Sequence, residues 1–313
     1  MRFEGIYTPV ITPFREDLSL DEPGYARLVE HQIAQGVHGL IIGGTTGEFY
    51  ALTHEERLIQ FRLAQRVIGG RRPWLAGVNH LRADEVCALA AAARDAGADG
   101  LLLGAPPYAM PTGPELAQHA LRVDRAAGLP IMLYNYPGRT GAEMDRAFLK
   151  AVKSSANIRA IKESSGELAR LQLIACEFPE LQLVCGADDQ ALEFFAWGAR
   201  AWVSGAANFL LPEALALYEA CVVRGDFAEG RRIMAALLPV LTVLERGGQF
   251  LACVKYACGA QGLPAGPVRP PLGPLSAELI RETDRALALA RKVLAEPQAP
   301  SAAARQAGRG ARP

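Results

Sequence analysis

The sequence predicts an α/β protein, a closed (β/α)8 or TIM barrel followed by a C-terminal helical extension. Short apolar runs alternate with longer amphipathic runs from residue 5 to about residue 225, which is typical of strands joined by crossover helices. Eight apolar runs occur in this part, the number of strands that closes a parallel barrel. Beyond them the pattern is helical only. We therefore expect residues 1–225 to form the barrel and residues 226–295 the extension.

Each expected strand is short and apolar, and each is bounded by residues typical of turns. The strands are expected at residues 5–11, 37–43, 73–78, 99–104, 129–134, 157–162, 181–186 and 200–204. The amphipathic segments between them are long enough for crossovers, as at residues 24–35, 53–68, 84–96 and 113–127. Thr53 and Glu56 are spaced as a helix capping box. The extension is expected as helices at residues 212–223, 226–245, 250–260 and 277–294.

Composition and charge exclude several classes of partner. Hydrophobic residues make up 50% of the chain and charged residues 21%, which is typical of a soluble globular protein. Lys+Arg and Asp+Glu both number 33, so no overall positive field attracts nucleic acid or an anionic membrane. The first residues lack the apolar core of a signal peptide, and we expect a cytoplasmic protein. Residues 296–313 are rich in Ala, Gly, Pro and Arg and are expected to be a disordered tail.

Cysteine and histidine patterns give little support to a metal site or to disulfides. The six cysteines are dispersed without CxxC pairs, mostly in apolar segments, which favours reduced thiols in the core. The five histidines form no HxH or HxxxH pair. We therefore expect no metal ligands in this chain.

Lys162 ends an apolar run that is expected to form a buried strand, residues 157–162. In a parallel barrel, the carboxyl ends of the strands carry the chemistry. Burial disfavours the charged ammonium and lowers its pKa, which gives a nucleophilic amine suited to Schiff-base formation. Taken by itself, this segment favours the simpler interpretation, a lysine whose ammonium extends to solvent at a strand end.

A glycine-rich turn, GGTTGE, follows the second expected strand at residues 43–48. Its glycines allow a close approach to an anion, and the hydroxyls of Thr45 and Thr46 converge with backbone N–H groups. The turn suits a carboxylate or a phosphate. It lacks the lysine and the spacing of a P-loop, so nucleotide binding is disfavoured.

Further polar residues follow other strands. Tyr134 closes the fifth apolar run and suits an acid/base role, and Arg139 suits a bidentate clamp on a carboxylate. The alternatives are a packed ring and a solvated loop charge. Tyr108, on the stiff loop after the fourth run, is by itself better explained by packing. After the seventh run, Gly186 leaves room for a ligand, and Asp188 is expected to cap the following helix.

These turns all fall on one face of the expected barrel: GTTGE, PPY, YNYPGRT and IKESSG. With them, the sequence strongly resembles the dihydrodipicolinate synthase/N-acetylneuraminate lyase family, class I aldolase-like barrels that form a Schiff base with a 2-oxo acid. The resemblance runs from GIYTPVITPF near the start to about residue 294.

The resemblance implies catalytic roles for four residues. Lys162 would be the Schiff-base nucleophile and Tyr134 the acid/base. Thr45 would relay protons between Tyr134 and Tyr108. Tyr108 would come from a neighbouring subunit of a homotetramer built as a dimer of dimers. No metal and no organic cofactor is implied.

The resemblance also implies a substrate-binding set. Thr46 and the loop amides, including that of Gly47, would hold the carboxylate of the 2-oxo acid. Arg139 would order the site and bind a second carboxylate. Gly186 and Val203 are expected to line the pocket.

Two departures from dihydrodipicolinate synthases bear on the substrate. Residues 109–110 are Ala-Met where such enzymes usually have tyrosine and asparagine, and residues 49–50 are Phe-Tyr where they usually have small residues. We therefore expect a narrower, less polar pocket and a lyase that cleaves, dehydrates or deaminates a hydroxylated C5–C6 2-oxo acid, or a cyclic imine such as pyrroline-4-hydroxy-2-carboxylate.

Two alternatives stay open. The first is 4-hydroxy-tetrahydrodipicolinate synthase, which condenses pyruvate with aspartate semialdehyde. The second is a non-catalytic barrel that senses a 2-oxo acid. Binding alone needs no nucleophile and no proton relay, so Lys162, Tyr134, Thr45 and Tyr108 together argue against a sensor.

Overall fold

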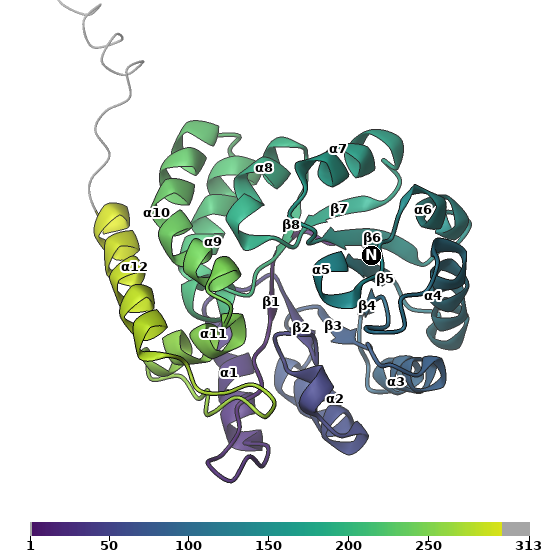
Figure 1. Ribbon diagram of the computed structural model, residues 1–313, viewed down its shortest axis with the longest axis horizontal. Coiled ribbons are helices and arrows are strands. Elements are labelled where there is room, and N and C mark those ends of the chain that lie inside the picture. Colours follow the sequence, from purple (N-terminus) through teal and green to yellow (C-terminus); the bar gives the residue numbers. More distant parts are fainter. Residues whose placement is uncertain (1, 296–313) are drawn as a thin grey trace, which may run out of the picture.

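The protein is a closed eight-stranded parallel barrel with helices on its outside, as Figure 1 shows. The computed structural model describes residues 2–295, so the expected disorder of residues 296–313 concerns a segment outside the described residues. Each strand pairs with the next along the chain, and β1 closes the barrel by pairing with β8. The predicted (β/α)8 fold is confirmed.

All eight strands lie where the apolar runs predicted them, with ends that differ by a few residues. They are β1 (Gly5–Pro9), β2 (Gly39–Ile42), β3 (Trp74–Gly77), β4 (Gly100–Gly104), β5 (Ile131–Asn135), β6 (Ile158–Glu163), β7 (Gln182–Cys185) and β8 (Ala201–Val203). β5 and β6 each run one residue past the prediction. Lys162 is therefore held within β6, and its pairing partner on β5 is Tyr134.

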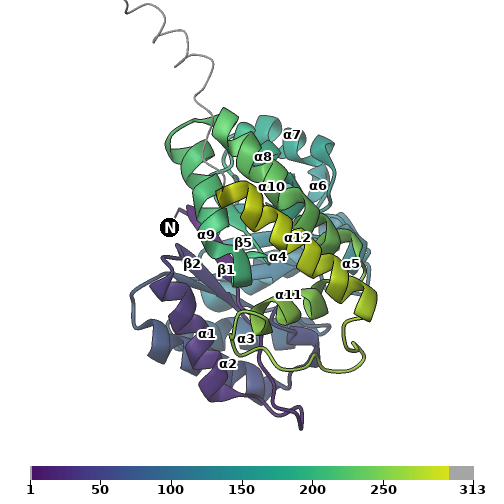
Figure 2. The ribbon, with the colours of Figure 1, turned by 90° about the vertical axis from the view of Figure 1, so that its left-hand side faces the viewer.

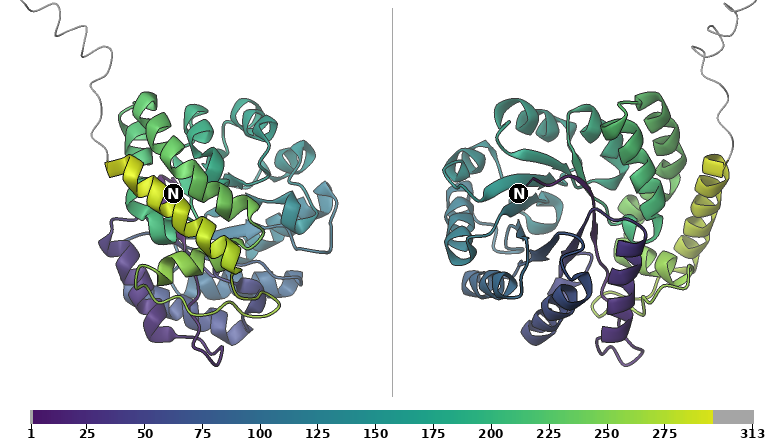
Figure 3. Two further views of the ribbon diagram at one scale, coloured as in Figure 1. Left: turned by 60° about the vertical axis from the view of Figure 1, so that its left-hand side comes forward. Right: turned by 180° about the vertical axis from the view of Figure 1, so that it is seen from behind.

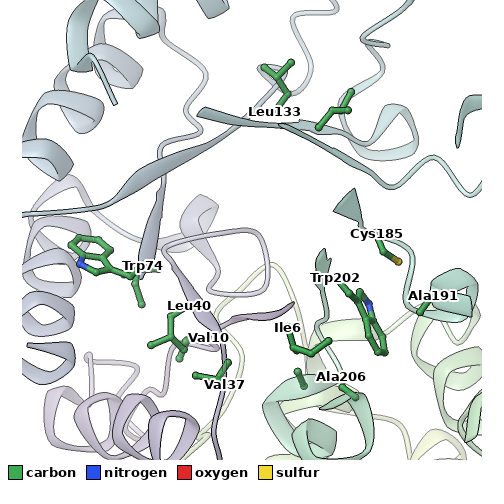
Figure 4. Close-up of a cluster of buried hydrophobic side chains, with 14 of the residues drawn as sticks. Ile6, Val10, Val37, Leu40, Trp74, Leu133, Cys185, Ala191, Trp202 and Ala206 are labelled. Carbon is green, nitrogen blue, oxygen red and sulfur yellow. The ribbon is translucent and has the colours of Figure 1, made fainter. Parts of the chain in front are cut away.

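Both faces of the sheet are apolar because the barrel interior and the helix layer each need filling. Tyr7, Ile41 and Val184 belong to the inner cluster of buried side chains. Their neighbours in sequence, such as Leu40, join the larger cluster between the strands and the helices. Figure 4 shows part of this outer layer, with Leu40 and Trp74 among its labelled side chains. The core thus fixes the strands at whose ends the polar residues lie.

Helices follow the strands as crossovers. They are α1 (Glu22–Ala34), α2 (His54–Ile68), α3 (Ala83–Asp95), α4 (Gly113–Ala127), α5 (Pro137–Thr140), α6 (Arg146–Val152), α7 (Leu168–Glu177), α8 (Ala191–Ala196) and α9 (Ala207–Tyr218). The capping box predicted at the start of α2 is present: Thr53 N donates to Glu56 Oε2 at 2.9 Å, and Glu56 N donates to Thr53 Oγ1 at 3.2 Å. α9 begins earlier than predicted, because it continues past a kink at Leu210 and includes Pro212.

The extension consists of α10 (Phe227–Arg246), α11 (Phe250–Gly259) and α12 (Ala277–Ala295). α10 packs against α8 and α9, and α12 lies across its outer side, as Figures 2 and 3 show. The C-terminal end of α10 contacts a short 3-10 turn after β7, η2 (Asp188–Gln190). The extension therefore reaches the end of the barrel where the strands terminate. Among residues 2–295, no helix is long and apolar enough to cross a membrane.

Candidate active site

A cavity of about 250 Å³ opens at the carboxyl ends of the strands. We refer to it as the Lys162 cavity. Seven of the nine residues singled out from the sequence line it: Thr45, Thr46, Tyr134, Arg139, Lys162, Gly186 and Val203. The barrel closure brings them together from five strands and loops that are far apart in the chain. Gly47 and Tyr108 are the two that lie elsewhere.

Lys162 is buried in this cavity, with 7% of its surface exposed. Its Nζ lies 4.0 Å from the centroid of the Tyr134 ring. Burial lowers the pKa of the amine to about 8, while the negative charges of Asp188 and Glu245 act in the opposite direction. At pH 7, on the order of one amine in ten is then neutral, far more than for a free lysine. The interpretation of Lys162 as an ammonium extended to solvent is wrong.

Tyr134 lies beside Lys162, on the adjacent strand β5. Burial raises the pKa of its phenol to about 12, and the charge of Arg139 and the nearby hydroxyls of Ser164 and Thr45 act in the opposite direction. The phenol is therefore protonated at neutral pH and can donate a proton. Thr45 lies close enough to Tyr134 to influence its titration, as the expected relay requires.

Glu163, which follows Lys162 on β6, joins the ends of β5 and β6. Its carboxylate accepts hydrogen bonds from Asn135 Nδ2 at 2.8 Å and from the backbone N–H of Ser165 at 2.7 Å. Because neighbouring residues of a strand face opposite sides, these bonds fix the strand without occupying the cavity. Lys162 is thus presented to the cavity by a rigid element.

Gly186 is required at its position by close packing. A Cβ added there would clash with Ser164 Oγ and would lie 2.7 Å from Lys162 Cγ. A larger residue would push the lysine side chain out of place. Gly186 therefore leaves space for the Lys162 side chain, and the expectation that it also leaves room for a ligand stays a prediction.

The glycine-rich loop after β2 is fixed by the extension. Glu48 adopts a left-handed backbone conformation with φ of 58° and is fully buried. Its carboxylate pairs with Lys255 Nζ at 2.5 Å, and it accepts a hydrogen bond from the backbone N–H of Arg269 at 2.9 Å. Thr45 and Thr46 face the cavity from this loop. Gly47 is buried beneath it, where its carbonyl accepts from Thr12 Oγ1 at 2.6 Å.

Arg139 lies in α5 at the rim of the cavity. Its guanidinium carbon is 5.1 Å from the centroid of the Tyr136 ring and 5.9 Å from that of Phe250. Within residues 2–295, no carboxylate forms a salt bridge with Arg139. Its charge is therefore open to an anionic substrate, held in place by two aromatic rings.

Tyr108 does not line this cavity in its own chain. It is 94% exposed and has a positive φ of 69°, which is uncommon for a residue with a side chain. The chain therefore holds a tyrosine outward on a strained loop. An exposed aromatic ring in this position fits a contact with another molecule.

One expectation about a neighbouring residue is wrong, and another is not tested. Asp188 does not cap the helix that follows it. Its carboxylate instead accepts hydrogen bonds from Trp202 Nε1 at 2.8 Å and from the backbone N–H of Ala206, at the start of α9, at 2.9 Å. Phe49 and Tyr50 do not line the Lys162 cavity. They line an adjacent cavity of about 320 Å³ that shares Thr45, Tyr134 and Arg139 with the Lys162 cavity, so their expected effect on the pocket stays a prediction.

Among the residues of the cavity wall that were not singled out from the sequence are Tyr136, Phe250 and Glu245. Tyr136 follows β5 within a segment that was noted, two residues after Tyr134. Phe250 and Glu245 belong to the extension, where only the helical pattern was interpreted. Their signal is tertiary, because it depends on how α10 and α11 pack on the barrel.

A parallel (β/α)8 barrel with a desolvated lysine beside a buried tyrosine at its carboxyl end defines the class I, lysine Schiff-base type of lyase barrel. Comparison with known proteins narrows the class. A sequence model of the Dihydrodipicolinate synthetase family matches residues 2–290, and the chain belongs to this family. It is accordingly an enzyme of a class I lysine Schiff-base family.

Relatives and solved structures agree with this assignment. The chain is 33% identical to 4-hydroxy-tetrahydrodipicolinate synthase of Heliobacterium modesticaldum over 277 residues, which covers 87% of this chain and 90% of the relative. It is 37% identical to 4-hydroxy-tetrahydrodipicolinate synthase 2 of Streptomyces coelicolor, with 88% and 91% covered. The crystal structure of dihydrodipicolinate synthase from Cyanidioschyzon merolae with lysine bound superposes with a TM-score of 0.88 at 30% identity, covering 92% of this chain and 98% of that one.

Proposed function

We propose that the protein forms an imine between Lys162 and a small 2-oxo acid. One observation supports this most directly: a buried amine with a pKa lowered to about 8 lines a cavity and lies 4.0 Å from the ring of a protonated tyrosine. A neutral amine is the nucleophile that attacks a carbonyl carbon. A pyruvate-like molecule of a few heavy atoms fits a cavity of about 250 Å³.

The first steps follow from the states of the two side chains. The Lys162 amine attacks C2, and the resulting carbinolamine loses its hydroxyl as water when the Tyr134 phenol donates a proton. The tyrosinate left behind then removes a proton from C3. The electron pair moves into the C2–C3 bond, and the product is an enamine on Lys162. Both protonation states at the start agree with the directions in which burial moves the two pKa values.

Substrate anions are held at two places. Thr46 and Thr45, with the amides of their loop, face the carboxylate next to C2. Arg139, which has no carboxylate partner within residues 2–295, faces a second anionic or strongly polar end at the rim. A planar guanidinium suits a carboxylate because it donates two parallel hydrogen bonds.

We place condensation of pyruvate with aspartate semialdehyde first among the possible reactions. Its support is the name 4-hydroxy-tetrahydrodipicolinate synthase carried by the relatives reported above. Aspartate semialdehyde also brings a carboxylate for Arg139. The hydroxylated C5–C6 2-oxo acid, or its cyclic imine, becomes the second candidate. It is favoured by the aromatic walls of Tyr136 and Phe250.

Incubation with pyruvate and sodium borohydride, followed by mass spectrometry, tests the imine. We expect one pyruvyl adduct per chain on the peptide that contains Lys162, and no adduct in Lys162→Ala. Labelling that persists in Lys162→Ala contradicts the assignment. A trapped adduct without turnover of any substrate in the panel below favours the sensor barrel over an enzyme of either kind.

The choice between reactions is made by comparing kcat/KM across a panel. The panel consists of three kinds of substrate, each tested separately. They are pyruvate plus aspartate semialdehyde, hydroxylated C5 and C6 2-oxo acids, and pyrroline-4-hydroxy-2-carboxylate. We expect the condensation to have the highest kcat/KM. A higher value for a hydroxylated substrate makes dehydration or deamination the function.

We further propose that the enzyme works as an oligomer in which Tyr108 completes the site of a neighbouring subunit, as in a homotetramer. The support is the 94% exposure and positive φ of Tyr108. We expect Tyr108→Phe and Lys162→Ala proteins to be inactive separately and to regain activity when their subunits exchange. No recovery, with exchange shown by native mass spectrometry, contradicts a shared site.

A further inference from the structure

Glu245, in the last turn of α10, is a carboxyl group that the expected catalytic set does not include. It lines the Lys162 cavity and also a neighbouring cavity of about 440 Å³. It therefore stands where the two spaces meet, together with Arg139. The C-terminal end of a helix disfavours negative charge, because the helix dipole is negative there.

The charged groups that face Glu245 come from several elements. Asp188 and Asp189 belong to η2, which packs against α10. The remaining groups on the cavity wall are Lys162 from β6, Arg139 from α5 and Arg246 from α10 itself. Arg246 is committed to Asp189, with Nη2 and Oδ2 separated by 3.3 Å. Three carboxyl groups thus line one small cavity, and they cannot all be ionised at low energetic cost.

Hydrogen bonds decide which of these carboxyl groups holds a proton. Asp188 is 2% exposed, and each of its two oxygens accepts a bond from a fixed N–H group, Trp202 on Oδ1 and Ala206 on Oδ2. Burial raises the pKa of Asp188, while these two bonds and the charge of Lys162 act in the opposite direction. A proton on either oxygen of Asp188 would displace one of the two bonds, so the proton is held at lower cost on Glu245. Asp189 has Arg246 as a partner. Glu245 is the carboxyl group left to carry the proton.

The titration of Glu245 agrees with this assignment. Burial raises the pKa of Glu245 to about 7, and the negative charges of Asp188 and Asp189 act in the same direction. A hydrogen bond from the backbone N–H of Asp188 and the charge of Lys162 act in the opposite direction. Near neutral pH the group is thus poised to give up a proton and to take it back, as a general acid requires.

We propose that Glu245 is the general acid that donates a proton to the oxygen on C4 of the substrate chain bound to Lys162. The proposal rests on the imine at Lys162 described above. Tyr134 is engaged at C2 and C3. Of the three carboxyl groups in the cavity, Asp188 has two fixed N–H partners and Asp189 has a salt bridge, whereas Glu245 has neither among residues 2–295.

The same proton transfer serves either reaction. In a condensation, the enamine carbon C3 attacks the aldehyde carbon, which becomes C4; the C3–C4 bond forms, and the aldehyde oxygen takes the proton of Glu245 and becomes a hydroxyl. In an elimination, the enamine electrons form the C3–C4 double bond, the C4–O bond breaks, and the hydroxyl leaves as water with that proton. In both, Glu245 ends as a carboxylate and is reprotonated from solvent.

Glu245→Gln tests the proposal, because glutamine keeps the size and the hydrogen-bond acceptor but donates no acidic proton. We expect kcat with the best substrate of the panel to fall about 10²–10³-fold. Imine trapping with pyruvate, and exchange of the C3 hydrogens of pyruvate in D2O, need only Lys162 and Tyr134, so we expect both within about threefold of the unchanged protein. Glu193→Gln, an exposed helical glutamate outside the cavity, is the matched control and should leave all three measurements unchanged.

The pH profile separates a general acid from a residue that only holds the cavity together. Since Glu245 must be protonated to act, kcat of the unchanged protein should decline as the pH rises through about 7, and this decline should be absent in Glu245→Gln. Glu245→Asp should recover at least about tenfold over Glu245→Gln, because it restores the acid. If Glu245→Gln fails to fold, the recovery and pH profile of Glu245→Asp decide.

Each result has one meaning. A kcat of Glu245→Gln within about threefold of the unchanged protein overturns the proposal, as does an unaltered alkaline decline. If the unchanged protein itself forms no trapped imine, the proposed function of Lys162 is contradicted. That result is distinct from a failure of the Glu245 proposal.

Discussion

Among residues 2–295, two lysines are buried, and they differ in what lies beside them. Lys162 is 7% exposed and Lys255 is 3% exposed, and burial is the main cause that lowers the pKa of each. Lys255 has Glu48 at 2.5 Å and donates to the carbonyl of Pro267 at 2.7 Å. Within residues 2–295, Lys162 Nζ has no hydrogen-bond or salt-bridge partner; it faces the Tyr134 ring and the open cavity.

The comparison shows that burial alone does not make a nucleophile. A fixed carboxylate stabilises the charged form of Lys255, so its ammonium serves as a structural cation beneath the glycine-rich loop. Lys162 lacks such a partner, so the same loss of water favours the neutral amine. The identity of the neighbour, rather than the degree of burial, assigns one lysine to structure and the other to chemistry.

The largest expected effect concerns the neighbour of Lys162. Tyr134→Phe keeps the ring beside the amine and removes the hydroxyl, and we expect kcat to fall about 10²–10⁴-fold with the fold retained. Steady-state kinetics with circular dichroism measures both. A loss of tenfold or less makes Tyr134 a packing residue. The comparison of the two lysines would then lack support for a catalytic role of the side chain beside Lys162.

The next effect concerns Lys255. Lys255→Met leaves the buried Glu48 carboxylate without its cation, and we expect the free energy of unfolding to drop by about 3–5 kcal/mol. Urea unfolding measures the change. The double variant Lys255→Met/Glu48→Gln removes both charges and should recover a large part of the loss. A single variant as stable as the unchanged protein means that the pair does not hold the loop.

The smallest expected effect is an increase in stability. Lys162→Met should raise the free energy of unfolding at pH 7 by about 1–3 kcal/mol, since it removes an unpaired buried charge. Below pH 8, Lys162 is charged in the folded and the unfolded state, so the full cost of burying the charge is present. As the pH rises from about 8 toward 10.5, the folded amine loses its proton first and that cost disappears.

Urea unfolding of both proteins at several pH values checks this sign. The advantage of Lys162→Met should shrink between pH 8 and 10.5 as the unchanged protein gains stability. A variant that is less stable at pH 7 means that Lys162 has a stabilising partner, and the two lysines then differ less than their surroundings indicate.

The sequence predicted those parts of the fold and site that depend on local pattern. Apolar runs located all eight strands, and motifs directly after strands located Thr45, Tyr134 and Lys162 at one end of the barrel. Such residues share a face because the carboxyl ends of parallel strands always meet there. Strand ends were less well predicted, and the extra residue on β6 is what places Lys162 inside the strand.

The remainder depends on tertiary structure. Glu245 lies in a helix whose pattern shows only which side is apolar, and its place in the cavity follows from the packing of α10 on α8 and η2. The left-handed turn at Glu48 also has no signal in residue type, because non-glycine residues rarely adopt this conformation. Lys255 and Arg269, which fix that turn, are distant in the sequence, so their contacts with Glu48 could not be predicted from local residue patterns.

The partnership of Glu48 with Lys255 and Arg269 has a consequence for synthesis of the chain on the ribosome. Glu48 and the backbone N–H of Arg269 are 221 positions apart, so the loop that carries Thr45 and Thr46 is made long before its partners. Translation delivers residues in order from the N-terminus. A nascent chain that already contains Lys162 and Tyr134 still has a glycine-rich loop whose buried carboxylate lacks its cation. The enzyme therefore becomes competent only near the end of its own translation, and chains released early are expected to be inert toward 2-oxo acids.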